Sequence, residues 1–291
     1  MATAELVLDA KAKLGEGPFW HGRERVLYWV DIESKILNIF DPRDRTNRRI
    51  HLPSRVGTAA PTRGRDILVA LEDGIYRLDP ESEALSKIVD PEPDRTDNRF
   101  NDGKCSPEGR FWAGTMSLER KIGAANLYCL HPDGRIEKKL TDITTSNGLA
   151  WSADGTTMYY IDTKKQNVRA FDYDPATGNI ANERVIIEVP DEMGHPDGMT
   201  IDSEGTLWVA LFYGGGVSRW DPVTGTLIEK YDVGAKNVTA CTFGGDDLST
   251  LYITTARAGT SDEELRHYPS AGGVFALEPG VSGKPAFEFA G

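Results

Sequence analysis

The chain has 291 residues, 39% of them hydrophobic, and a formal net charge of −12. This composition allows a sizeable core, and the acidic balance argues against nucleic-acid binding, which needs clustered Lys and Arg. No run of 18 apolar residues occurs, and residues 1–13 lack the pattern of a signal peptide, so we expect no membrane association and a cytoplasmic location.

Short apolar strands recur along the chain, and the spacing between them is 40 to 49 residues. Each strand is preceded by a turn rich in Gly, Asp or Asn, which supplies the backbone conformations that tight hairpins require. A repeat of this length is typical of a propeller blade. The predicted strands are residues 27–31, 67–70, 111–114, 158–162, 207–210 and 251–254.

We therefore predict an all-β fold, a six-bladed β-propeller with four-stranded blades around a central channel. No Gly/Ser-rich linker divides the chain, which predicts a single domain over residues 1–291. A closed ring needs its ends joined, and we expect residues 5–8 to complete a blade with residues 286–289. One short helix is expected at residues 261–267, with Ser261 as its N-cap.

Four polar residues stand in phase with this repeat. Glu16, Asn101, Asn147 and Asp197 each precede a predicted strand by 10 or 11 residues. On local sequence alone, an Asn-Gly or Asp-Gly pair is an ordinary hairpin signal. The shared offset instead indicates one structural position in four blades, and equivalent positions of a propeller lie on a ring around its channel.

Two carboxylates and two amides on such a ring are hard oxygen ligands, which suit a divalent cation. Four protein ligands leave coordination positions for water and substrate, as in a catalytic metal site. The three cysteines are widely spaced and form no CxxC pair, which indicates buried free thiols rather than a zinc–thiolate site. One divalent cation is therefore expected, with Ca²⁺ or Zn²⁺ favoured and Mn²⁺, Mg²⁺ and Fe²⁺ as alternatives.

Other polar residues are expected near the same end of the channel. Arg99 lies two positions before Asn101, so both side chains share one face of a strand, although a surface ion pair is the alternative for Arg99. Glu119 follows a predicted strand and is either a hydrogen-bond acceptor for hydroxyl groups or a solvated side chain. His195 precedes Asp197, but a single loop histidine is a weak signal for a catalytic base.

Seven motifs occur in an order that resembles one known family. They are residues 14–18, 99–104, 113–116, 146–149, 196–199, 241–245 and 271–275. With these motifs, nearly the whole chain resembles the gluconolactonases and regucalcin (senescence marker protein). Members of that family are six-bladed propellers with one divalent metal in the channel.

The resemblance implies a metal site and a reaction. Glu16, Asn147 and Asp197 match the metal ligands. Next to a metal and its water, Asp197 is expected to act as the catalytic general base, or at least to orient the nucleophile. Asn101 matches a residue whose contact with the metal is more distant or mediated by water. The implied reaction is hydrolysis of an aldonolactone, such as gluconolactone, to the sugar acid.

The resemblance also implies how a substrate is held. Arg99 and Glu119 match residues that hold sugar hydroxyls, and Asn101 matches a residue at the metal and substrate site, so all three are expected to position the ring hydroxyls. The expected partner is a small-molecule sugar lactone, with no obligate protein partner. Two alternatives remain: a phosphotriesterase or esterase of the same fold, and a non-catalytic calcium-binding or protein-interaction propeller.

Overall fold

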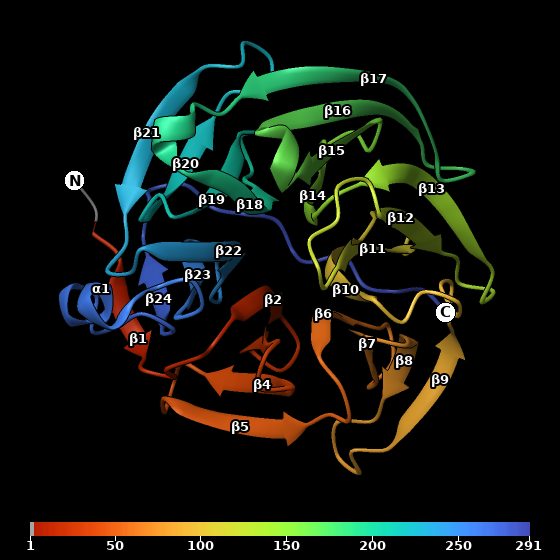
Figure 1. Cartoon of the computed structure of the whole chain (residues 1–291), viewed down its shortest axis with the longest axis horizontal. Coiled ribbons are helices and arrows are strands. Elements are labelled where there is room, and N and C mark those ends of the chain that lie inside the picture. Colours follow the sequence, from red (N-terminus) through yellow and green to blue (C-terminus); the bar gives the residue numbers. More distant parts are fainter. Residues whose placement is uncertain (1–2) are drawn as a thin grey trace.

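The computed structural model describes residues 3–291. Six four-stranded antiparallel sheets are arranged as blades around a central channel (Figure 1). Each apolar segment identified in the sequence forms the second strand of its blade. The predicted six-bladed β-propeller is therefore confirmed.

Within each blade, the strands are given in order from the channel outward. Blades 1 to 3 are β2 (Gly15–His21), β3 (Val26–Asp31), β4 (Ile36–Asp41) and β5 (Thr46–His51); β6 (Val56–Pro61), β7 (Ile67–Leu71), β8 (Gly74–Leu78) and β9 (Leu85–Val89); and β10 (Asn98–Cys105), β11 (Phe111–Ser117), β12 (Ala125–Leu130) and β13 (Ile136–Ile143).

Blades 4 to 6 are β14 (Ser146–Trp151), β15 (Thr157–Asp162), β16 (Asn167–Asp174) and β17 (Asn179–Glu188); β18 (His195–Ile201), β19 (Leu207–Phe212), β20 (Gly216–Trp220) and β21 (Leu227–Asp232); and β22 (Asn237–Gly244), β23 (Thr250–Ala256), β24 (Val274–Leu277) and β1 (Glu5–Leu8).

The hydrophobic core lies between neighbouring blades. Each of six apolar clusters combines side chains from two adjacent blades, such as Val30 of blade 1 with Val69 of blade 2. The second strands are covered by the blades on both sides, and Trp112 and Trp208 on them are fully buried. This two-sided burial explains why these strands read as continuous apolar segments.

The N-terminal strand closes the ring, as expected, but its predicted partner was wrong. β1 pairs with β24, with Glu5 opposite Ala276. Residues 286–289 form no strand in blade 6, because the free edge of β24 is taken by β1. Instead, residues 278–291, which we call the C-terminal strap, run along one face of the propeller, where Phe289 bridges Thr62 of blade 2 and is buried.

The innermost strand of every blade contains an irregularity in its pairing with the second strand. The register shifts lie between Glu16 and Phe19 in blade 1 and between Phe100 and Gly103 in blade 3, and the other four blades have one at the equivalent place. A β-bulge bends a strand and re-aims its side chains. The repeat thus places a local irregularity at the same position of every innermost strand, where it can redirect side chains toward the channel.

The only α-helix among residues 3–291 is α1 (Asp262–His267), which begins after Ser261 with a complete capping box, as predicted. None of the helices in this part of the chain is long and apolar enough to span a membrane.

Gly57 on β6 provides a test of inter-blade packing. A Cβ atom there would lie 2.3 Å from the carbonyl oxygen of Phe100 and 2.5 Å from that of Asn101. We expect Gly57→Ala to lower the free energy of unfolding in urea by about 1–3 kcal/mol, because backbone must move to make room. Gly22→Ala is the matched control, since nothing lies within 4 Å of that position. Equal stability of the two variants would contradict the packing described here.

Candidate functional site

The four in-phase residues come together in the channel, where we call them the polar ring. Glu16, Asn101, Asn147 and Asp197 lie on the innermost strands β2, β10, β14 and β18, and each is 3–5% exposed. The Asn101 side-chain amide donates to Asn147 Oδ1 at 3.1 Å and to the carbonyl oxygen of Ser146 at 2.8 Å. The bulges in these strands bring the side chains to one level of the channel.

Ionisation of the carboxylates in the polar ring is unfavourable in the surroundings that the described residues provide. Burial raises the pKa of Glu16 to about 8, and the neighbouring Asp102 carboxylate adds to the effect. Burial also raises the pKa of Asp197 well above its usual range, and repulsion from Glu16 and Asp102 raises it further. Carboxylates in such surroundings ionise readily only when a cation is supplied.

The polar ring has the donor set that a divalent cation requires. Asp197 Oδ1 is buried and has no hydrogen-bond partner within residues 3–291. In that part of the chain, no group of three His, Cys, Asp or Glu side chains that could hold a metal ion occurs. The two carboxylates together with the Asn147 amide oxygen are hard oxygen ligands. These residues fit a divalent metal.

Asn147 is held in the orientation that this role needs. Its Nδ2 donates to Thr163 Oγ1 at 2.7 Å, and the Thr163 hydroxyl donates to the carbonyl oxygen of Pro196 at 2.8 Å. These bonds identify the nitrogen end of the Asn147 amide, so that Oδ1 faces the polar ring. Thr163 had no signal in the sequence, because its contact depends on the turn after β15.

Arg99 is buried next to the polar ring. Its Nη1 donates to Asn101 Oδ1 at 2.7 Å and to the carbonyl oxygen of Phe100 at 2.8 Å. Burial lowers the pKa of Arg99 to about 10, although the nearby carboxylates of Glu33 and Glu16 oppose this shift. The guanidinium remains charged at neutral pH, and it lies at the same end of the channel as the ring.

Glu119 lies outside the buried site. It follows β11 on a loop, its side chain is 67% exposed, and it pairs with Lys121 at 3.0 Å. A contact between Glu119 and substrate hydroxyls therefore stays a prediction.

A third buried carboxylate, Asp102, was not anticipated as part of the site. It is 7% exposed and accepts a hydrogen bond from its neighbour Gly103 N at 2.7 Å. Asp102 directly follows Asn101, and regular strand alternation would point it to the other face. The bulge between Phe100 and Gly103 removes that alternation, so both residues contribute to the channel.

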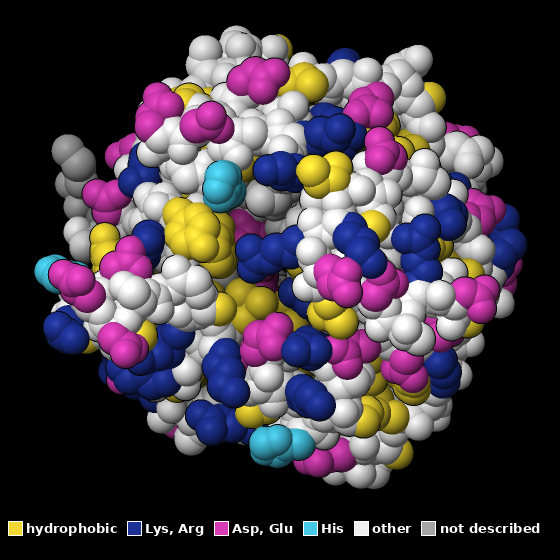
Figure 2. Space-filling view, viewed as in Figure 1, with side chains coloured by type: hydrophobic (Ala, Val, Ile, Leu, Met, Phe, Trp, Pro, Cys, Tyr) yellow, Lys and Arg dark blue, Asp and Glu magenta, His cyan; other side chains and the backbone are white. Residues whose placement is uncertain are grey.

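The sequence also contained no indication of an aromatic wall at the channel mouth, which is formed by Tyr213 and His195. Tyr213 follows β19, its ring lies 6.0 Å from that of His195, and Lys236 Nζ lies 5.0 Å from its centroid. Tyr213 has a φ of 64°, which is unusual for a bulky residue, and it is 43% exposed. Figure 2 shows a hollow near the centre of this face, with hydrophobic and charged side chains around it.

The raised pKa of Glu16 predicts a pH dependence for the metal-stripped protein. The folded state holds the Glu16 proton more tightly than the unfolded state, so stability is lost as pH rises from the ordinary value of 4.5 to about 8. Glu16→Gln should remove this loss, at most about 1.4 kcal/mol per pH unit. Urea unfolding of both proteins between pH 5 and 8 tests it. Parallel stability curves would contradict the prediction.

Comparison with known proteins agrees with this geometry. The family described as "SMP-30/Gluconolactonase/LRE-like region" matches residues 14–257. The chain is 42% identical to the "Putative sugar lactone lactonase YvrE" of Bacillus subtilis (strain 168) over 288 residues, 99% of each chain. It is 39% identical to regucalcin of Gallus gallus over 295 residues, which are 99% of this chain and 98% of the relative.

A solved structure is also similar to this chain over nearly its whole length. The calcium-binding protein regucalcin from Agrobacterium tumefaciens strain C58 superposes with a TM-score of 0.95 at 29% identity, with 99% of this chain and 97% of the other covered. The matched ranges extend over all six blades. The chain therefore belongs to the SMP-30/gluconolactonase/LRE-like family.

Proposed function

We propose that the protein is a lactonase that hydrolyses a sugar lactone, such as an aldonolactone, to the sugar acid with the help of one divalent cation. The observation that carries this proposal is the buried pair Glu16 and Asp197, with an unpartnered carboxylate oxygen beside the Asn147 amide. The Bacillus subtilis relative is named for sugar lactone hydrolysis, which supports the substrate class.

The metal would be held by Glu16, Asn147 and Asp197. When bound, a divalent cation supplies Lewis acidity toward a lactone oxygen and makes water more acidic. The choice of ion is a separate proposal: the Agrobacterium regucalcin is described as calcium-binding, which supports Ca²⁺, and Zn²⁺ is the second candidate. Both ions accept oxygen ligands.

Asp197 is the residue best placed to take a proton from the attacking water. Its Oδ1 has no partner among the described residues and is therefore free to accept a hydrogen bond. Its raised pKa makes it a stronger base than an exposed carboxylate once it is ionised. The neighbouring carboxylates of Glu16 and Asp102 raise that basicity further.

Arg99 and Asn101 would orient the substrate. Arg99 is anchored through Nη1, and no partner for its Nε or Nη2 occurs among residues 3–291, so these N–H groups can donate to ring hydroxyls. Asn101 is fixed by bonds at both ends of its amide. Donors that are already fixed lose little entropy on binding, so they hold the lactone in a reactive position.

Replacing the proposed base tests the reaction. We expect Asp197→Ala to lower kcat for gluconolactone hydrolysis by at least about 100-fold, because it removes both a base and a metal ligand. Asp232→Ala is the control, since that side chain is 87% exposed. The assay follows acid release by the metal-stripped protein with each cation restored in turn. Retained activity in Asp197→Ala would refute the assignment, and turnover of phosphotriesters but no lactones would favour the esterase alternative.

The aromatic wall should affect substrate binding more than the chemical step. We expect Tyr213 to pack against the C–H face of the sugar ring, because its ring lies 6.0 Å from that of His195, which shares β18 with Asp197. Tyr213→Asn keeps a residue that tolerates positive φ and removes the ring. We expect its KM for a hexonolactone to rise about five-fold with little change in kcat, an effect of about 1 kcal/mol. A lower kcat at unchanged KM would contradict this role, and Tyr213→Phe should behave like the wild type.

A further inference from the structure

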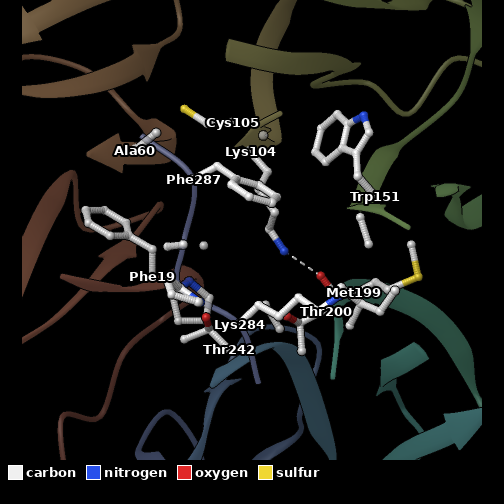
Figure 3. A pocket seen from close by; sticks show the side chains of 18 of the residues that line it. Phe19, Ala60, Lys104, Cys105, Trp151, Met199, Thr200, Thr242, Lys284 and Phe287 are labelled. Carbon is white, nitrogen blue, oxygen red and sulfur yellow. Dashed lines mark hydrogen bonds between the residues drawn. The ribbon is translucent and has the colours of Figure 1, made fainter. Parts of the chain in front are cut away.

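A cavity of about 180 Å³ lies in the channel on the side of the polar ring opposite the mouth; we call it the far chamber. Its walls come from residues that follow the ring residues on the innermost strands, including Phe19, Trp151 and Met199. The C-terminal strap covers it with Lys284 to Phe287 (Figure 3). An apolar cavity of about 150 Å³ is known to admit benzene, so the far chamber can hold a ring-sized molecule.

Lys104 is the unusual residue of the far chamber. Figure 3 shows it extending from β10 across the cavity, where Nζ donates to the carbonyl oxygen of Met199 at 2.6 Å. An ammonium group has three donors, and no second partner or ion pair of Lys104 occurs among residues 3–291. Burial lowers the pKa of Lys104, which reflects the cost of holding this charge away from water.

The charge balance of the far chamber favours an anion. Lys104 and Lys284 both line the cavity, whereas Asp102 is the one carboxylate among the lining residues. Asp102 raises the pKa of Lys104 but does not form an ion pair with it. An anionic group would satisfy the free donors of Lys104, and an apolar body would pack against Phe19, Trp151 and Phe287.

We propose that the far chamber is a second binding site, which takes a small organic carboxylate with a ring-sized apolar body and pairs the carboxylate with Lys104. The site is separate from the mouth used by the lactone, because the polar ring lies between them. The proposal therefore does not depend on lactone hydrolysis.

The face opposite the mouth offers a way in. A second hollow of about 580 Å³ shares Pro61, Pro285 and Ala286 with the far chamber and is also lined by Arg23 and Arg25. The strap residues therefore form part of the partition between this hollow and the chamber. Two arginines at the outer side make the approach compatible with an anion, although they also pair with Glu288 and Asp246.

Titration calorimetry of the metal-loaded protein with benzoate tests the proposal, with benzyl alcohol as the neutral probe of similar size. We expect one benzoate per chain and at least about tenfold weaker binding of benzyl alcohol. Lys104→Met should weaken benzoate binding by about tenfold or more, whereas Lys104→Arg should retain most of it. Lys230→Met, at an exposed lysine that lines neither hollow, is the control, with a change of about threefold or less. Gluconate in excess should not displace benzoate.

A second measurement uses the unaltered protein, so it does not depend on the folding of a variant. Reductive methylation of lysines is followed by peptide mass spectrometry with and without benzoate. Benzoate should slow the modification of Lys104 and leave Lys230, an exposed surface lysine, unchanged. No benzoate binding, equal binding by Lys104→Met, displacement by gluconate, or equal methylation of Lys104 in both samples would each overturn the proposal.

Discussion

The buried carboxylates of Glu16 and Asp197 are the feature on which the rest of the site depends. The Asp102 carboxylate raises the cost of ionising both, Glu16 raises it further for Asp197, and burial removes the water that would otherwise stabilise their charge. Arg99 opposes this cost only in part, because its own charge is buried and its hydrogen bonds go to Asn101 and Phe100. The unpartnered Asp197 Oδ1 shows where a cation would contribute most. The same buried carboxylates that would bind a metal therefore lower the stability of the metal-free fold.

The propeller creates this arrangement by repeating one local irregularity. A bulge in each innermost strand interrupts the alternation of side chains, and six such strands meet around one channel. Close inter-blade packing holds the bulges in place, as at Gly57, which lies against the backbone of Phe100 and Asn101. The same strands then continue past the polar ring and line the far chamber. One scaffold thus provides two compartments of different chemistry, an acidic oxygen-rich one and a largely apolar one with the partly buried ammonium of Lys104.

Much of this could be predicted from the sequence, because strands and turns are local signals and the repeat adds a shared coordinate. The strand segments, the capping box of Ser261 and the convergence of Glu16 with Asp197 all follow from spacing. The partner of β1 did not, since residues 286–289 and β24 are both short segments rich in apolar residues, and only the three-dimensional position of the free edge distinguishes them. Asp102 was missed because a bulge cannot be read from alternation. The far chamber depends on where the strap crosses, which is a long-range property.

We propose that the polar ring is a cation site whose carboxylates are largely protonated until a metal binds. The most direct measurement is calorimetric titration of the metal-stripped protein with Ca²⁺ or Zn²⁺ at pH 7 in buffers of different ionisation enthalpy, which gives the number of protons released. With the pKa of Glu16 at about 8 and that of Asp197 also raised, we expect one ion per chain and release of about one to two protons. Binding without proton release, or no binding by either ion, would contradict the account.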